Sequence, residues 1–294
     1  MTAPLISLLL PTRGRPALVE RFFRSVVETT LRLERVEVVL YIDEDDLGSH
    51  YLACPDIRVT KIIGPRMTMG AYNTACLEKA TGSIIMLVND DMIIRTKGWD
   101  ERIVALDGEF PDGVYLIYGN DLLKKRNMCT FPILSRRTCE LLVEPYPRAY
   151  LGAFIDFHLL DIFKRLQHLG FDRIRYLDDV VFEHLHYRAK KAVIDDTYLQ
   201  RGRFDDDSIF FAQSGVRRIG AKRLVSALKG MGVPSNEGQN EAQFMPTDFF
   251  SAAWYATREL LFDPGLPLRW RSLVWAWFLA RYLARKGLLR PFFQ

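Results

Sequence analysis

Residues 83–91 read Ser-Ile-Ile-Met-Leu-Val-Asn-Asp-Asp. A short apolar run that stops at a polar cluster is typical of a buried strand in a parallel sheet. Ligands of such sheets bind outside the carboxyl ends of the strands. This stretch therefore predicts an α/β fold and also indicates where its chemistry takes place.

Three similar apolar runs precede this stretch. They cover residues 6–10, 36–42 and 57–63. Apolar residues recur at helical spacing between the runs, over residues 18–27 and 72–80, and we expect Gly82 to cap the second helix. The alternation of strand and helix predicts right-handed crossovers and a mostly parallel sheet that helices cover on both faces.

Beyond residue 113 the sequence predicts a region of both strands and helices, followed by a region of helices only. Strands are expected at 114–118, 130–134, 174–177 and 180–182, and helices at 155–169, 217–231, 249–261 and 270–289. The last two helices are apolar and rich in aromatic residues, whereas the helix at 217–231 is basic.

The composition is that of a globular protein. The chain has 294 residues, of which 49% are hydrophobic and 26% are charged, with a net charge of +4. These values exclude global disorder and low-complexity repeats. The four cysteines lack the two-residue spacing of zinc or redox motifs, and no secretory signal is evident, so we expect a cytoplasmic protein with free thiols.

The predicted strands end in polar clusters that suit a cation. Thr12-Arg13, 43–46 and 89–91 follow three of the four strands, and two of these clusters are acidic. Two acidic clusters at one edge repel each other unless a cation lies between them. His184 and His186 follow a later strand on one face, and an imidazole ligand favours Mn²⁺ over Mg²⁺. No Gly-x-Gly-x-x-Gly or Gly-Lys-Ser phosphate loop is present, which argues against a dinucleotide site.

The order of these motifs resembles that of family 2 type glycosyltransferases with the GT-A fold. The resemblance spans roughly residues 5–200. It is carried by Leu8-Leu9-Leu10-Pro11-Thr12-Arg13, Tyr41-Ile42-Asp43, Gly70-x-x-Asn73-x-Ala75, Leu87-Val88-Asn89-Asp90-Asp91, Gly152-Ala153-Phe154-Ile155-Asp156 and the run from Tyr176 to His184. It implies a Rossmann-like α/β sheet, here with a helical C-terminal extension.

The resemblance also implies a role for each matching position. Pro11, Thr12 and Arg13 would line the nucleotide pocket, and Asp43 would accept a hydrogen bond from the base. The residues expected near the ribose and diphosphate are Arg66, Asn73, Asn89 and Asp90. Asp91 would bind Mn²⁺ or Mg²⁺ together with His184 or, as the second choice, His186.

Asp156 would be the catalytic base of an inverting transfer. Asp161 is an alternative base, and Asp156 could instead be only a helix cap. Two positions depart from the family pattern: Asn89 replaces the first Asp of the Asp-x-Asp motif, and Arg13-Gly14 replaces an aromatic-Asn pair.

The resemblance implies a domain division and an activity. We expect a catalytic domain over 1–200, with nucleotide-binding residues 1–112 and acceptor-binding residues 113–200, followed by a basic, aromatic-rich helical extension over 201–294. The implied activity is transfer of a sugar from a nucleoside diphosphate sugar, with UDP favoured, to a glycan or glycolipid in cell-surface polysaccharide assembly. The alternatives are a sugar nucleotidyltransferase and an inactive carbohydrate-binding or scaffold protein.

The tail at 265–294 carries six basic residues and no acidic residue, interleaved with aromatic residues. Its uncharged stretch, 272–280, is too short to span a bilayer. Such a composition favours peripheral contact with the inner face of a membrane, and the alternative is a helix packed on the catalytic domain or in a dimer. Basic residues among aromatic ones also suit single-stranded nucleic acid, but no nucleic-acid motif supports that interpretation.

Overall fold

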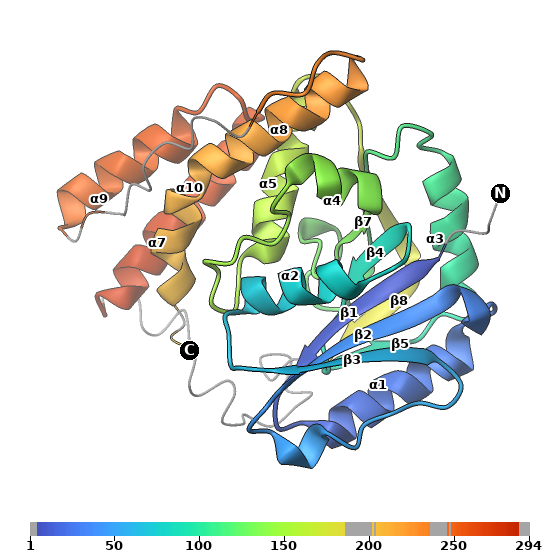
Figure 1. The fold of residues 1–294 in the computed structure, drawn as a ribbon. Helices are drawn as coiled ribbons and strands as arrows, with labels where there is room; N and C mark the ends of the chain where they lie inside the picture. The colour runs from blue at the N-terminus through green and yellow to red at the C-terminus, as the bar shows by residue number, and fades with distance from the viewer. Residues whose placement is uncertain (1–4, 186–201, 203, 236–245, 247, 288–294) are drawn as a thin grey trace.

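The computed structural model describes residues 5–185, 202, 204–235, 246 and 248–287. Its centre is an eight-stranded sheet with the order β3-β2-β1-β4-β7-β6-β8-β5 (Figure 1). The strands are β1 (Ile6–Thr12), β2 (Val36–Asp43), β3 (Arg58–Gly64), β4 (Ile84–Leu87), β5 (Met92–Ile94), β6 (Leu116–Asn120), β7 (Ile133–Ser135) and β8 (Ile174–His184). The predicted α/β class is confirmed.

The sheet is parallel in its first half and mixed in its second. β1 pairs in parallel with both β2 and β4, and β2 pairs in parallel with β3. β7 is antiparallel to both β4 and β6, while β6 and β8 are parallel. Since two antiparallel steps restore the direction, β1, β2, β4, β6 and β8 all end at the same edge.

Helices cover both faces. They are α1 (Pro16–Thr29), α2 (Met69–Lys79), α3 (Trp99–Gly108), α4 (Arg136–Leu142), α5 (Ile155–His168), α7 (Asp205–Ala212), α8 (Ser214–Leu228), α9 (Phe249–Ala256) and α10 (Leu268–Arg285). Alternate residues of β1 separate two cores: Leu8 packs with α1 and α3, whereas Leu9 packs with α2, α5 and the C-terminal helices. This alternation is what a strand buried on both faces requires.

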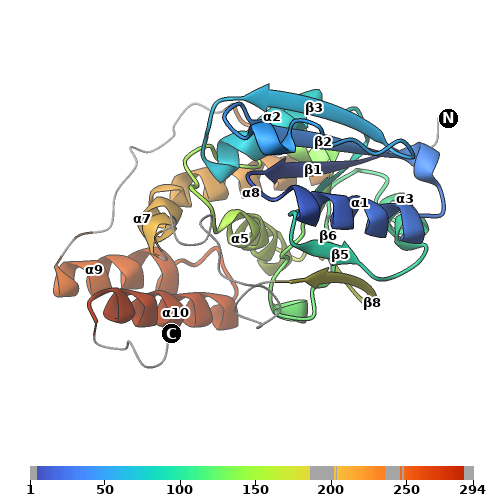
Figure 2. The same cartoon turned by 90° about the horizontal axis from the view of Figure 1, so that it is seen from below.

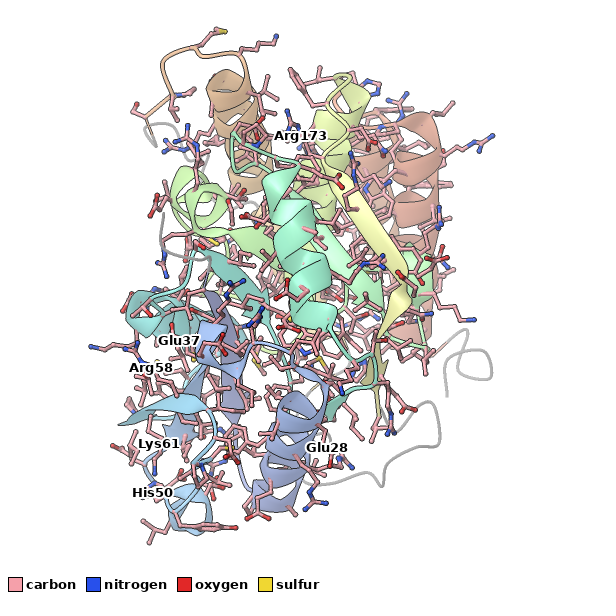
Figure 3. All side chains as sticks on the ribbon, turned by 90° about the vertical axis from the view of Figure 1, so that its right-hand side faces the viewer. Glu28, Glu37, His50, Arg58, Lys61 and Arg173 are labelled. Carbon is pink, nitrogen blue, oxygen red and sulfur yellow. The ribbon has the colours of Figure 1, made fainter. Side chains whose placement is uncertain are left out.

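A buried polar network ties the strands together at the opposite edge, where they begin. The Glu37 Oε1 atom accepts hydrogen bonds from Ser7 Oγ at 2.7 Å and from the backbone nitrogen of Thr81 at 2.6 Å. Arg58 on β3 lies beside Glu37, as Figure 3 shows, with 3.6 Å between Arg58 Nε and Glu37 Oε2. The pKa of Glu37 lies below its ordinary value. Burial alone would raise this pKa, but the hydrogen bonds from Ser7 and Thr81 stabilise the ionised carboxylate and outweigh the effect of burial.

Two sequence expectations are wrong in detail. α2 is followed by Ala80 in an extended conformation, so Gly82 does not cap it. A Cβ on Gly82 would instead overlap the carbonyl oxygen of Leu5, so this glycine permits close packing before β4. The strands expected at 174–177 and 180–182 form one strand, β8, whose pairing passes from β6 to β5.

The C-terminal helices pack on α5, and they use the aromatic residues of the tail. The Trp277 ring stacks on Phe157 with 4.9 Å between centroids, and the Phe278 ring stacks on Phe154 at 5.6 Å. The Trp270 ring also stacks on Phe157, at 5.5 Å. The packing alternative is therefore confirmed for these three rings, and contact of 265–294 with a membrane stays a prediction. In the described part of the chain no helix has the length and apolar character needed to cross a bilayer.

Gly70 lies where α2 packs closely against the segment 147–151, and substituting it tests that contact. Its backbone nitrogen donates to the Tyr150 carbonyl at 3.0 Å, and a Cβ there would overlap the Pro147 carbonyl oxygen. We expect Gly70→Ala to destabilise the protein by about 1–3 kcal/mol in urea unfolding, because overpacking outweighs alanine's helix propensity.

Gly108→Ala is the matched control. Gly108 ends α3, and a Cβ there would meet no atom within 4 Å. This variant should be neutral or slightly more stable than wild type. Equal stability of the two variants would contradict the close approach of α2 to residues 147–151.

Candidate active site

The carboxyl edge of the sheet gathers polar residues from several strands. Thr12 ends β1, Asp43 ends β2, and residues 89–91 follow β4. Asn120 ends β6 and His184 ends β8. Their convergence follows from the strand directions, and it places the predicted polar clusters at the edge where α/β sheets bind ligands.

Asp90 is held by the loop that follows β1. Its Oδ2 accepts from Thr12 Oγ1 at 2.8 Å, and its Oδ1 accepts from Arg15 Nη1 at 3.0 Å. Burial raises the pKa of Asp90, and the Arg15 guanidinium opposes that rise. The first loop is therefore fixed to the Asn89-Asp90-Asp91 turn. Arg15 is a site residue that the sequence analysis did not single out.

Asp43 is held by two donors. Arg13 Nη1 donates to its Oδ2 at 2.7 Å, and the Tyr72 hydroxyl donates to its Oδ1 at 2.5 Å. Arg13 also forms a bidentate pair with Asp45, at 2.5 and 2.8 Å. The Asp43 side chain is fully buried beneath these donors, whereas the Arg13 side chain is one-third exposed, so Arg13 is the member of the pair that a ligand can reach.

The other predicted nucleotide residues surround this edge. Pro11 is buried in β1, opposite Tyr41 of β2, and Asn73 is buried on α2. Arg66 is exposed in the loop after β3. Asn89 is half-buried, and its carbonyl accepts from the Met92 nitrogen at 3.1 Å, which closes the turn before β5.

Asp91 and His184 form the candidate metal pair. β5 and β8 are antiparallel with Met92 opposite His184, so that His184 Nε2 lies 3.3 Å from Asp91 Oδ2. Both side chains are buried. The Leu185 nitrogen donates to the Asp91 carbonyl at 2.9 Å and fixes the two residues relative to each other. His186 lies outside the described residues.

The donor chemistry of this pair fits a divalent cation. A carboxylate oxygen and an imidazole nitrogen suit Mn²⁺, and Mg²⁺ or Mn²⁺ often takes only one or two protein ligands beside substrate phosphates. Within the described ranges no group of three or more His, Cys, Asp or Glu residues could hold a metal ion. A two-residue site that substrate oxygens complete is consistent with that finding.

Asp156 is the second residue of α5 and is half-buried. Phe154 occupies the N-cap position, and Asp156 accepts from the Phe157 nitrogen at 2.8 Å, so its carboxylate satisfies one first-turn amide of α5 without being the N-cap residue. Burial raises the pKa of Asp156 to about 6, although the hydrogen bond from the Phe157 nitrogen and the nearby His184 imidazole act against that rise. A carboxylate with this pKa is ionised at pH 7 and well suited to accept a proton.

A carboxylate from the C-terminal extension holds the loop before Asp156. Asp206 of α7 accepts three bonds from consecutive backbone nitrogens, those of Leu151 at 2.7 Å, Gly152 at 3.0 Å and Ala153 at 2.7 Å. The next residue, Phe154, has a φ of 69°, which is costly for a bulky side chain. The carboxylate on these amides stabilises the turn that presents Asp156.

Asp161, the alternative base, belongs to an interior ion-pair network. It is 1% exposed, and its Oδ2 accepts from Arg165 Nε at 3.1 Å and Arg217 Nε at 3.0 Å. Trp270 Nε1 lies 3.3 Å from Asp161 Oδ1. The structure therefore gives Asp161 a role in attaching α8 and α10 to α5 and makes it unsuitable as a base.

Asp121 is a second residue that the sequence analysis missed. Its Oδ1 accepts from the nitrogens of Leu123, Lys124 and Lys125, and its Oδ2 accepts from Thr130 Oγ1 at 2.7 Å. The His184 nitrogen donates to the Asp121 carbonyl at 3.1 Å. The polar pair Asn120-Asp121 at a strand end is the signal that could have identified it.

Comparison with known proteins identifies the fold. No family model matches the chain, and a search of curated proteins finds no relative. Among solved structures, the mannosyltransferase PcManGT from Pyrobaculum calidifontis, in complex with GDP-Man and Mn²⁺, is similar with a TM-score of 0.51 and 16% identity over 98% of this chain and 88% of that one. S. aureus TarS 1–349, in complex with UDP-GlcNAc, has a TM-score of 0.49 and 13% identity over 96% of this chain and 92% of that one. The chain thus has the GT-A fold of nucleotide-sugar glycosyltransferases, as predicted.

Proposed function

We propose that this protein is a metal-dependent glycosyltransferase that moves a sugar from a nucleoside diphosphate sugar to a hydroxyl of a glycan or glycolipid. The observation that carries the proposal is the pairing of Asp91 with His184 at the carboxyl edge of a GT-A sheet, where the His184 imidazole also acts on the pKa of Asp156. A metal pair and a carboxylate of raised pKa, close enough to interact, are the groups that this transfer needs.

The donor would lie against the ends of β1 and β2. The buried Asp43 holds the partly exposed Arg13 through their bond at 2.7 Å, so a guanidinium is preorganised there for a base or ribose, and contact with Asp43 itself would require Arg13 or Tyr72 to move. UDP is the first nucleotide to test. GDP is the comparator, since the similar mannosyltransferase was solved with GDP-Man.

Asp91 and His184 would hold Mn²⁺ or Mg²⁺. When bound, the ion supplies positive charge that stabilises the departing nucleoside diphosphate. The backbone bond between Leu185 and Asp91, at 2.9 Å, keeps the two side chains in register before any ligand arrives. This preorganisation reduces the cost of assembling the site.

Asp156 would accept the proton of the acceptor hydroxyl as that oxygen attacks the anomeric carbon. The bond from the anomeric carbon to the diphosphate then breaks on the opposite face, so the configuration inverts. Glycosyl transfer has oxocarbenium character, and a carboxylate at the acceptor side also stabilises that positive charge.

The nucleotidyltransferase alternative gains no support from the first loop. Such an enzyme needs basic groups free to cradle a triphosphate, but Arg13 is engaged by Asp43 and Asp45 and Arg15 by Asp90. The scaffold alternative depended on Asn89 replacing an Asp. The Asn89 backbone carbonyl closes the turn before β5, and the carboxylates of Asp90 and Asp91 are still present, so this replacement alone does not favour an inactive protein. Calorimetric titration of UDP, GDP and CMP, with and without Mn²⁺, tests these alternatives against the transferase.

Asp91→Ala should abolish the Mn²⁺-dependent part of UDP or GDP binding while the fold survives, because one of two protein ligands is lost. Calorimetry measures nucleotide affinity, and electron paramagnetic resonance measures bound Mn²⁺ directly. Asp179→Ala is the control, since Asp179 is an exposed carboxylate on β8 that pairs with Arg102 at 2.9 Å. Wild-type Mn²⁺ affinity in Asp91→Ala would refute the metal assignment.

Asp156→Asn should retain nucleotide binding but slow turnover by about 10²–10⁴-fold, because asparagine keeps the shape and cannot take the proton. Release of nucleotide from UDP-glucose, UDP-GlcNAc and GDP-mannose by hydrolysis gives a readout that needs no acceptor. Asp178→Asn, an exposed carboxylate of β8, is the matched control. Unchanged turnover of Asp156→Asn, in a protein that turns over a donor, would show that Asp156 is not the base.

The pH dependence of stability tests the environment of Asp156. Because its pKa is raised to about 6, the folded state binds more protons than the unfolded state between about pH 4 and 6. Ionisation therefore costs stability as the pH rises through this window, up to about 3 kcal/mol. In urea unfolding with EDTA, Asp156→Asn should be more stable than wild type at pH 7.5 and similar to it near pH 4.

Asp161→Asn should change stability in the opposite direction. It leaves Arg217 without a buried counter-charge and Arg165 with Asp263 as its remaining partner, and loss of one member of a buried ion pair typically costs about 3–5 kcal/mol. For Asp156→Asn the contrary outcome is a stability at pH 7.5 no greater than that of wild type. That result would show that burial does not raise the pKa of the Asp156 carboxyl, and the assignment of Asp156 as the base would lose its support from the raised pKa.

A further inference from the structure

Four aromatic side chains on and next to α9 point into solvent. They are Phe249, Phe250, Trp254 and Phe262, with 44%, 83%, 62% and 58% of their surface exposed, and we call them the α9 aromatic face. Figures 1 and 2 both place α9 beside α10 on the outer side of the molecule. Aromatic residues exposed together in this way mark an interaction surface.

The four rings form one connected surface. Phe250 and Trp254 are four residues apart on the helix, so they share a side of it. The rings of Phe249 and Phe250 lie 5.5 Å apart, and those of Trp254 and Phe262 lie 6.4 Å apart. The π-helical turn Thr257–Leu261 continues the chain from α9 to Phe262.

Basic residues flank both ends of this face. Arg258 lies one turn beyond Trp254 and is exposed, and Arg269 is exposed at the start of α10. At the other end, Phe249 contacts the Tyr282 ring at 6.0 Å, and Lys286 Nζ lies 5.6 Å above that same ring. Residues 249–287 contain six basic and two acidic residues, and one of the basic residues, Arg281, is buried against Asp207 at 2.7 Å.

The two acidic residues of this segment balance only part of that charge. Asp263 is buried and pairs with Arg165 at 2.9 Å. Glu259 is half-buried and pairs with Arg218 at 3.0 Å and with Arg258 at 3.1 Å. The exposed Arg269 and Lys286 have neither of these acidic groups as a partner, and they supply the positive charge beside the rings. The exposed face is therefore aromatic with a positive margin, which is the composition of an interfacial membrane helix.

We propose that the α9 aromatic face docks on the surface of an anionic bilayer, with the rings in the interfacial region and the flanking basic residues on lipid phosphates. The proposal does not depend on the transfer reaction. It differs from contact through 265–294, because Trp270, Trp277 and Phe278 of that tail are stacked on α5. Deleting the tail would remove part of the core, so point substitutions on α9 are the appropriate test.

Charge favours a membrane over a second copy of the chain. A twofold interface brings the same surface of both copies together. The basic margins of two copies would then face each other, and like charges in contact are destabilising. Anionic lipid headgroups instead complement these margins.

The test is flotation of the full chain with vesicles of phosphatidylcholine alone and with phosphatidylglycerol added, at low salt and at 0.15 M salt. We expect binding only to the anionic vesicles, weakened by salt. F250S/W254S should lower the partition coefficient by about a hundredfold, since two large apolar side chains no longer enter the interface. L47S/Y51S, which removes two exposed apolar side chains from the segment after β2, should bind like wild type.

Circular dichroism and thermal unfolding verify that both double variants fold. The proposal is overturned if wild type does not float with anionic vesicles at low salt, or if F250S/W254S floats equally well. It is also overturned if sedimentation shows a wild-type dimer that F250S/W254S dissociates, since the face would then be a self-interface.

Discussion

The antiparallel pairing of β5 with β8 is the contact on which the candidate site depends. β5 is only three residues long, yet it begins directly after Asp91 and places Met92 opposite His184. Residues almost a hundred positions apart thereby bring a carboxylate oxygen and an imidazole nitrogen within 3.3 Å. A slip of one residue in this register would turn His184 to the other face of the sheet and separate the pair.

The C-terminal helices support the same site from the other side. Asp206 holds the amides of 151–153, and the neighbouring Asp207 pairs with Arg281 of α10 at 2.7 Å. Arg281 in turn lies 5.2 Å from the Phe154 ring, at the positive φ before Asp156. The extension is thus physically coupled to the start of α5, so the geometry around the proposed base depends on residues beyond the motifs at 5–200.

The sequence predicted the parallel half of the fold and its polar edge, because long apolar runs such as 6–10 have few alternatives to a buried strand. It did not predict β5, which is too short to have a periodicity. Asp121 and Asp206 were missed for a different reason: their partners are backbone amides, and a sequence does not reveal which amides a carboxylate will meet. The sequence favoured Asp156 over Asp161, and the structure adds the difference in their surroundings, since both lie on one helix.

The pKa values of buried carboxylates shift in opposite directions at the two edges of the sheet. At the edge where the strands begin, Glu37 receives bonds from Ser7 and Thr81 that hold its pKa low, so its charge is stabilised and the strands are tied together. At the carboxyl edge, Asp156 is desolvated with little compensation, and its pKa rises to about 6. A group that needed only to stabilise the fold would gain from further donors. The scarcity of donors at Asp156 costs stability, and it is the compromise expected at the catalytic base that we propose.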